Sequence, residues 1–204
     1  MTKLKICGLM SALDAAYVNA VQPDFAGMIL SPGFRRTVAP GTAQAIRETL
    51  DPAIPAVGVF VNAAAEEIAA YASCGIIQYV QLHGTEDAAY LRALRQICRL
   101  PVIQAFRIRT EADVRRAEQS GADFILLDSG TGSGKPFDWS LLCNVRREYF
   151  LAGGITPENA GAVIAAYHPL GLDVSSGVET DGRKDPEKME KIAAITRQQQ
   201  FSLE

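Results

Sequence analysis

Reactive side chains stand at the ends of two short apolar segments of this 204-residue chain. Cys7 closes the segment 4–7, and Asp128 closes the segment 124–128. A thiol held partly as thiolate by polar and cationic neighbours can remove a proton from carbon. A carboxyl group beneath a closing loop can have a raised pKa and act as an acid. The alternatives are a buried structural cysteine and an aspartate that only caps a loop.

Glycine and serine residues end two later apolar segments. Gly153 and Gly154 end the first of them, Ser175 and Ser176 end the second, and Gly177 follows it. Small residues let backbone N–H groups come close to a phosphate, and serine hydroxyls can donate to it as well. Each motif alone is also typical of a tight turn, but the two together favour a phosphate site.

Further candidates for contacts with a substrate lie in the intervening loops. Arg35 and Arg36 follow the segment 25–30, and an arginine there can bind a carboxylate with two hydrogen bonds. The alternative is a pair of solvated loop charges. His83 ends the segment 79–83 and is either a ligand contact or a histidine satisfied by its neighbours. The glycine-rich run 129–135 lacks the spacing of a nucleotide phosphate loop, so we interpret it as a lid.

Eight apolar segments alternate with segments of helical periodicity along the chain. The apolar segments cover residues 4–7, 25–30, 56–61, 79–83, 101–106, 124–128, 150–154 and 171–176. The helical patterns cover residues 12–21, 42–50, 63–74, 86–97, 111–120, 157–166 and 186–199, with a short helix near 139–145. Such alternation predicts an α/β fold, a single-domain (β/α)8 TIM barrel over residues 1–204. A doubly wound open sheet is the competing architecture.

Alternation along the predicted strands places polar side chains inside this barrel. Lys5 and Cys7 share one parity of the first strand, and Gln81 and His83 share one parity of the fourth. The other polar members assigned to this inward set are Gln104, Asp128, Asp173 and Ser175. Because they gather near the carboxyl ends of their strands, where barrel enzymes keep their active sites, the pattern predicts an enzyme.

Composition argues against several other classes of protein. The formal net charge is -3, without a basic stripe, so we expect no nucleic-acid partner. No apolar stretch is long enough for a signal peptide or a membrane span, which predicts a cytoplasmic protein with no membrane partner. Four dispersed cysteines and two histidines form no metal-ligand pattern. We therefore expect no metal and no cofactor, and the sequence gives no reason to expect more than a monomer.

Six motifs, in order along the chain, resemble one known family. They are residues 5–9 (KICGL), 58–62 (GVFVN), 81–84 (QLHG), 137–139 (FDW), 151–155 (LAGGI) and 173–179 (DVSSGVE). Together they resemble the phosphoribosylanthranilate isomerases of tryptophan biosynthesis. The resemblance implies a cofactor-free Amadori rearrangement of N-(5-phosphoribosyl)anthranilate, a small phosphoribosyl substrate, to the 1-deoxyribulose 5-phosphate isomer.

The same resemblance implies roles for individual residues. Cys7 is implied as the general base and Asp128 as the general acid, while Arg36 is implied to bind the anthranilate carboxylate. His83 and Asp173 are expected to contact the substrate. The implied phosphate-binding residues are Gly153, Gly154, Ser175, Ser176 and Gly177. The sequence departs from the family at residues 27–30, which lack the aromatic side chains often seen there, and the neighbouring Arg35 leaves the carboxylate contact open between two arginines.

Two rival functions are compatible with a phosphate-binding barrel. An indole-glycerol-phosphate synthase needs a catalytic lysine and glutamates on the inner strands, and only Lys5 is offered here. A non-catalytic phosphosugar-binding barrel would keep the glycine and serine motifs but would need neither Cys7 nor Asp128. Loss of substrate fluorescence on adding the protein separates the isomerase from both.

Overall fold

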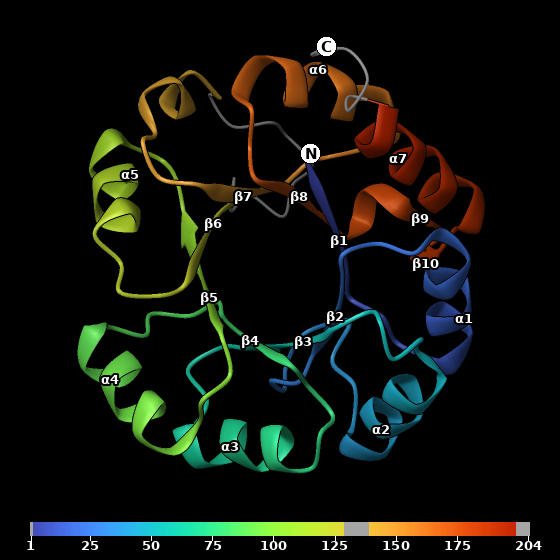
Figure 1. Cartoon of the computed structure of the whole chain (residues 1–204), viewed down its shortest axis with the longest axis vertical. Coiled ribbons are helices and arrows are strands. Elements are labelled where there is room, and N and C mark those ends of the chain that lie inside the picture. Colours follow the sequence, from blue (N-terminus) through green and yellow to red (C-terminus); the bar gives the residue numbers. More distant parts are fainter. Residues whose placement is uncertain (1, 129–138, 199–204) are drawn as a thin grey trace.

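Eight parallel strands close into a barrel in a computed structural model that describes residues 2–128 and 139–198. In Figure 1 the strands form the central ring and the helices surround it, with β1 and β8 side by side where the ring closes. The strands are β1 (Lys3–Cys7), β2 (Phe25–Ile29), β3 (Ala56–Phe60), β4 (Tyr79–Leu82), β5 (Val102–Arg107), β6 (Phe124–Asp128), β7 (Tyr149–Ala152) and β8 (Gly171–Val174). The predicted (β/α)8 barrel is confirmed, and the open sheet is excluded.

Within the described residues, seven α-helices surround the ring of strands (Figure 1). They are α1 (Ala12–Val21), α2 (Pro40–Thr49), α3 (Ala65–Ser73), α4 (Ala88–Ile97), α5 (Glu111–Glu118), α6 (Pro157–Tyr167) and α7 (Pro186–Gln198). Side chains at the N-cap begin several of them: Ser11 accepts from the backbone N–H of Asp14, and Thr110 accepts from that of Asp113. The predicted start of α4 at Glu86 is wrong by two residues, because Asp87 is the N-cap.

The connection after β6 departs from the pattern of one α-helix per strand. A 3₁₀ helix, Trp139–Asn144, stands where the sequence predicted a short helix near residues 139–145. The predicted lid, residues 129–135, and the first two residues of the 137–139 motif lie outside the described residues. A further element that the sequence did not predict is the antiparallel ribbon of β9 (Glu179–Thr180) and β10 (Arg183–Lys184), which follows the 3₁₀ turn Ser176–Val178.

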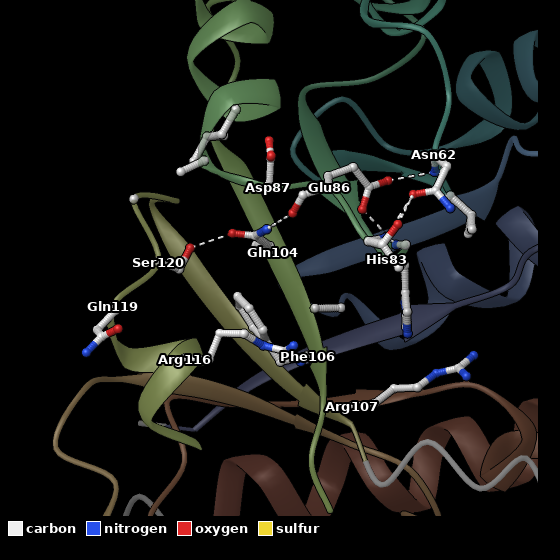
Figure 2. A pocket seen from close by; sticks show the side chains of 17 residues that line it. Asn62, His83, Glu86, Asp87, Gln104, Phe106, Arg107, Arg116, Gln119 and Ser120 are labelled. Carbon is white, nitrogen blue, oxygen red and sulfur yellow. Dashed lines mark hydrogen bonds between the residues drawn. The ribbon is translucent and has the colours of Figure 1, made fainter. Parts of the chain in front are cut away.

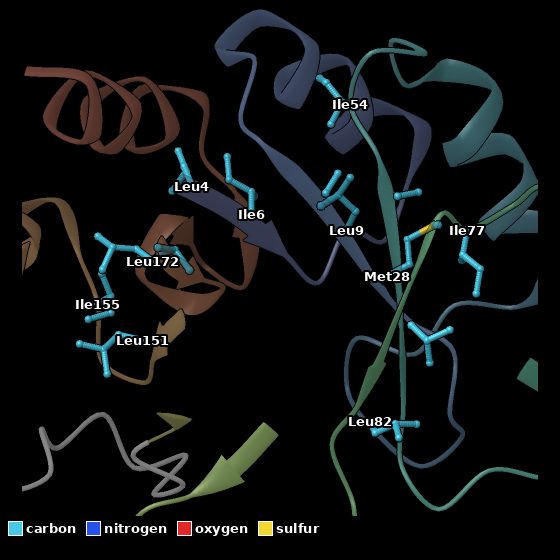
Figure 3. Packing of buried hydrophobic residues seen from close by; sticks show 14 of the residues in the cluster. Leu4, Ile6, Leu9, Met28, Ile54, Ile77, Leu82, Leu151, Ile155 and Leu172 are labelled. Atoms are coloured by element: carbon cyan, nitrogen blue, oxygen red, sulfur yellow. The ribbon is translucent and has the colours of Figure 1, made fainter. Parts of the chain in front are cut away.

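Apolar side chains form two separate cores, because the strands alternate between facing the helices and facing the barrel axis. The outer core packs strand residues such as Leu4, Ile6 and Leu172 against the helices (Figure 3). The inner core fills the lower barrel; its members are Phe25, Val57, Ile103, Ala105, Leu126, Phe150 and Ala152. Burial of these side chains drives closure of the barrel. The upper interior, at the carboxyl ends of the strands, is left to the polar residues.

Candidate active site

A buried ion pair connects the first and last strands at the upper end of the barrel. Lys5 lies opposite Asp173 in the register of β1 and β8, and its Nζ is 2.8 Å from Asp173 Oδ1. The Lys5 side chain has no exposed surface, and that of Asp173 is 8% exposed. A buried ammonium group requires a partner of this kind. The predicted inward parity of Lys5 and Cys7 is confirmed, since Leu4 and Ile6 lie in the outer core.

Cys7 lies two residues beyond Lys5 on the same face of β1. Burial raises the pKa of the Cys7 thiol, and the positive charges of Lys5 and Lys184 only partly oppose this effect. The direction of this shift runs against the expectation that polar and cationic neighbours hold the thiol partly as thiolate. Burial lowers the pKa of Lys5, but the charges of Asp173 and Cys7 outweigh it and the net shift is upward, so Lys5 stays an ammonium group.

Gly27 provides the space that this group of side chains needs. It lies opposite Cys7 in the register of β1 and β2. A Cβ atom at Gly27 would be 2.7 Å from Cys7 Sγ and 3.2 Å from Lys5 Nζ, so any larger residue would displace the thiol. From the sequence alone, residues 27–30 stood out only because they lack aromatic side chains. A glycine inside a strand is itself a signal of close approach.

His83 and Asp128 meet on the other side of the barrel mouth. The Nε2 of His83 is 3.2 Å from Oδ2 of Asp128, and the Nδ1 of His83 is 3.0 Å from Nε2 of Gln81. Asp128 ends β6, which is three steps from β1 around the closed ring through β7 and β8. The carboxyl group and the thiol therefore lie on different sides of one opening.

The side chains of Arg35 and Arg36 differ in where they lie relative to Cys7. Arg36 crosses over Gly8, because a Cβ there would be 2.6 Å from Arg36 Cδ, and its side chain is 20% exposed. Arg35 is 53% exposed and donates to the carbonyl of Gly182 on the ribbon. The position beside Gly8, the residue after Cys7, favours Arg36 over Arg35 as the group that reaches a ligand at the barrel mouth.

The carboxylate of Glu179 binds both arginines, a role that the sequence did not indicate. Its Oε1 accepts from Arg36 Nε at 2.7 Å, and its Oε2 accepts from Arg35 Nη2 at 2.6 Å. Lys184 donates to the same carboxylate at 3.1 Å and to the carbonyl oxygen of Ser175 at 2.9 Å. Three cations around one carboxylate leave this part of the mouth positively charged. Its position depends on the ribbon of β9 and β10, which no sequence pattern indicated.

The glycine and serine loops after β7 and β8 pack directly on each other. A Cβ on Gly177 would be 1.8 Å from the carbonyl oxygen of Ile155, so only glycine fits there. Gly153 and Gly154 have φ values of 92° and 67°, which glycine adopts without strain. A side chain on Gly154 would meet open space, so the backbone alone lines that position. Loops at these two strand ends are the usual phosphate site of such barrels.

Gln104 was assigned to the inward set, and that assignment is wrong. Its neighbours Ile103 and Ala105 belong to the inner core, so Gln104 faces the helix layer. Figure 2 shows its amide between the loop after β4 and Ser120, bound to the carbonyl of Glu86 at 2.8 Å and to Ser120 Oγ at 2.6 Å. It lines a cavity of about 680 Å³ that His83 also lines. Cys7, Asp128 and Asp173 are absent from the described lining of that cavity.

Acidic, thiol and cationic groups at the carboxyl ends of a closed ring of strands define a (β/α)8-barrel enzyme. The chain matches the family "PRAI: N-(5'phosphoribosyl)anthranilate (PRA) isomerase" over residues 4–194. It is 39% identical over 202 residues to the N-(5'-phosphoribosyl)anthranilate isomerase of Endomicrobium trichonymphae, covering 97% of this chain and 99% of that protein. The chain therefore belongs to the N-(5'-phosphoribosyl)anthranilate isomerase family.

Solved structures of the family agree with this assignment. Phosphoribosyl anthranilate isomerase from Thermotoga maritima superimposes with a TM-score of 0.89 at 36% identity, covering 97% of this chain and 100% of that chain. A phosphoribosyl anthranilate isomerase in complex with reduced 1-(o-carboxyphenylamino)-1-deoxyribulose 5-phosphate gives a TM-score of 0.87 at 35% identity, with the same coverage. Within the described residues, no helix is long and apolar enough to cross a membrane.

Proposed function

We propose that this protein converts N-(5'-phosphoribosyl)anthranilate to 1-(2-carboxyphenylamino)-1-deoxyribulose 5-phosphate, a step of tryptophan biosynthesis. The observation that carries the proposal is the placement of a thiol and a carboxyl group three strands apart on one barrel mouth, with a cationic cluster beside the thiol. The related isomerase in complex with a reduced form of this product supports the choice of substrate.

In the first step Asp128 acts as the general acid. Its proton goes to the furanose ring oxygen while the bond from that oxygen to C1 breaks, and the nitrogen lone pair forms a C1=N iminium. The acid must be protonated for this step and must lie within hydrogen-bond distance of the ring oxygen. The contact with His83 supports the assignment because it fixes the position of the carboxyl group at the mouth.

In the second step Cys7 acts as the general base. The iminium makes the C2 proton acidic, and the thiolate removes it to leave an enolamine that tautomerises to the ketone. The raised pKa of Cys7 means that little thiolate exists before the substrate binds, but the thiolate that forms is a strong base. Lys5 and Lys184 stabilise its charge, which supports the role of Cys7.

The remaining site residues bind the substrate in this proposal. Arg36 binds the anthranilate carboxylate, and its proximity to Gly8 supports it over Arg35. His83 and Asp173 contact the sugar. The phosphate-binding residues are Gly153, Gly154, Ser175, Ser176 and Gly177. Charge-assisted hydrogen bonds of this kind orient a substrate as well as binding it.

The proposal extends to the state in which the protein works. We propose that residues 1–204 act as one domain and as a monomer in the cytoplasm, without a metal or other cofactor. The exposed large hydrophobic residues that the structure describes, Leu13, Phe34 and Ile97, stand on three different segments of the chain, which supports a monomer. Sedimentation of the purified protein at micromolar concentration tests the monomer directly.

Fluorescence of the anthranilate–ribose substrate tests the proposed reaction. Adding the wild-type protein is expected to abolish the signal, and Asp128→Asn is expected to slow this by roughly 100-fold or more. Inorganic phosphate should still bind to the variant, because the loops after β7 and β8 are unchanged. A wild-type protein that binds phosphate but leaves the fluorescence unchanged would instead be a phosphosugar-binding barrel.

A further inference from the structure

Gln81 is a buried polar residue inside the barrel to which the proposed reaction gives no role. It lies on β4, opposite Val59 of β3 and Ile103 of β5, and only 1% of it is exposed. Its side-chain Nε2 lies 3.0 Å from Nδ1 of His83, which in turn contacts Asp128. An amide, an imidazole and a carboxyl group therefore form one chain of contacts that includes the proposed acid.

The amide determines which nitrogen of His83 carries a proton. The Nε2 group of Gln81 can only donate, so Nδ1 of His83 must accept and cannot hold a proton. In a neutral imidazole the proton is then on Nε2, from where it is donated to Oδ2 of Asp128 over 3.2 Å. The Gln81 amide therefore sets the direction of both hydrogen bonds.

We propose that Gln81 is a positioning residue that, through the tautomer of His83, directs the acidic proton of Asp128 toward the substrate. This inference rests on the proposed role of Asp128 as general acid. When Oδ2 accepts from His83, a protonated Asp128 carries its proton on Oδ1. Transfer to the ring oxygen breaks the ring C–O bond and forms the iminium, and the resulting carboxylate keeps the His83 hydrogen bond.

The opposite tautomer would work against this step. With the proton on Nδ1, the lone pair on Nε2 of His83 would accept the proton of Asp128, and the acid would be bound within the pair. Only the orientation of the Gln81 amide separates the two arrangements. A side chain in the third position of a triad often has this role of fixing a ring and its tautomer.

The stability of the fold gives no reason for an amide at this position. Gln81 Oε1 is buried and has no hydrogen-bond partner among the described residues. An unsatisfied buried acceptor costs about 1–3 kcal/mol. A leucine or methionine of similar size would fill the space between Val59 and Ile103 without this cost. The amide therefore suits the donor that His83 requires better than it suits the packing of the core.

Nitrogen NMR of the histidine rings tests the inference on the wild-type protein. The chain has two histidines, so ¹⁵N-histidine labelling gives few ring signals, and a His83→Asn variant assigns them. When the imidazole ring is neutral, we expect His83 to carry its proton on Nε2. A spectrum with the proton on Nδ1 overturns the proposal.

Two substitutions of Gln81 connect the tautomer with catalysis. Gln81→Leu removes the donor, and we expect mixed tautomers and a turnover number reduced about 10- to 100-fold, with KM changed less than about two-fold. Gln81→Glu puts an acceptor at Nδ1, which should make His83 an imidazolium and hold Asp128 as a carboxylate. Its turnover should fall further than that of Gln81→Leu.

Gln104→Leu is the matched control. Gln104 is also buried, at 8% exposure, and stands on the neighbouring strand, but it faces the helices and its amide binds Glu86 and Ser120. The control should lose stability while keeping the His83 tautomer and the turnover number. If Gln81→Leu reduces turnover no more than Gln104→Leu, the proposal is wrong. If Asp128→Asn retains full turnover, the proposed acid is wrong, whatever the tautomer of His83.

Discussion

The lower and upper halves of the barrel interior have opposite chemistry. In the lower half, aromatic rings meet edge to face: Phe25 and Phe150 at 5.7 Å, and Phe124 and Phe150 at 6.0 Å. In the upper half the neighbouring strands β1 and β8 carry a buried ion pair between Lys5 and Asp173. The dry lower layer excludes water beneath the polar layer, so electrostatic interactions above it are strong. Apolar side chains that stabilise the fold and polar side chains of the candidate active site therefore lie in successive layers inside one barrel.

Breaking the ion pair should have the largest effect on the upper layer. Asp173→Asn leaves the Lys5 ammonium buried without a counter-charge, and we expect the free energy of unfolding to fall by about 3–5 kcal/mol. Turnover should fall with it. Urea unfolding and the fluorescence assay measure the two quantities on the same samples.

A double variant separates stability from function in this layer. Lys5→Met combined with Asp173→Leu replaces the ion pair by apolar side chains, which often restores stability. We expect most of the lost free energy of unfolding to return while turnover stays low. A double variant as active as the wild type would show that the upper layer is not catalytic.

In the lower layer, Phe150→Ala should cost about as much stability without affecting the chemistry. The ring contacts Phe25 and Phe124, and its removal leaves a cavity that should cost about 3–5 kcal/mol. We expect the turnover number of the folded protein to stay within about two-fold of the wild type. Phe150→Leu, a smaller change, should cost less stability. A turnover number that falls in proportion to the stability would contradict the division into layers.

The barrel and its polar interior could be predicted from sequence better than the contacts among the polar groups. The alternation of eight apolar segments with helical segments was enough for the fold, and period-two parity was enough for the inward side of Cys7 and Gln81. It failed for Gln104, because a single polar residue in an apolar strand does not reveal which parity faces the axis. Glu179 was missed because its role depends on a two-residue ribbon that brings it to Arg36, and so short an element has no sequence period.

Glu179 should make stability depend on pH at the edge of the site. Burial alone would raise its pKa, but hydrogen bonds from Arg36 and Arg35 and the charge of Lys184 lower it to about 2. Because the pKa in the folded state lies below the unfolded value of 4.5, the ionised Glu179 stabilises the fold above pH 4.5. This stabilisation is lost as the pH falls toward 2. The contribution is about 3 kcal/mol at most. Urea unfolding between these pH values should show this loss, and Glu179→Gln should reduce it.

Substitutions of Arg35 and Arg36 have the smallest expected effects, and they distinguish the two candidates for the carboxylate contact. Arg36→Ala should raise KM by about 10- to 100-fold, since a hydrogen bond to a charged group contributes about 1.5–3 kcal/mol. Arg35→Ala removes a largely exposed ion pair, which contributes at most about 1 kcal/mol, so KM should change little. Steady-state kinetics compare them. A larger change in KM for Arg35→Ala would assign the carboxylate contact to Arg35.

The most direct test of the proposed catalytic role of the upper layer is to exchange the sulfur of Cys7 for oxygen and measure turnover and unfolding together. Cys98→Ser is the matched control, because Cys98 is 5% exposed and Cys7 is 6% exposed, but Cys98 ends α4 outside the barrel. We predict that Cys7→Ser lowers turnover by about 100-fold or more. Cys98→Ser should keep turnover, and both variants should lose similar free energies of unfolding. Turnover within ten-fold of the control would contradict the assignment of Cys7 as the base.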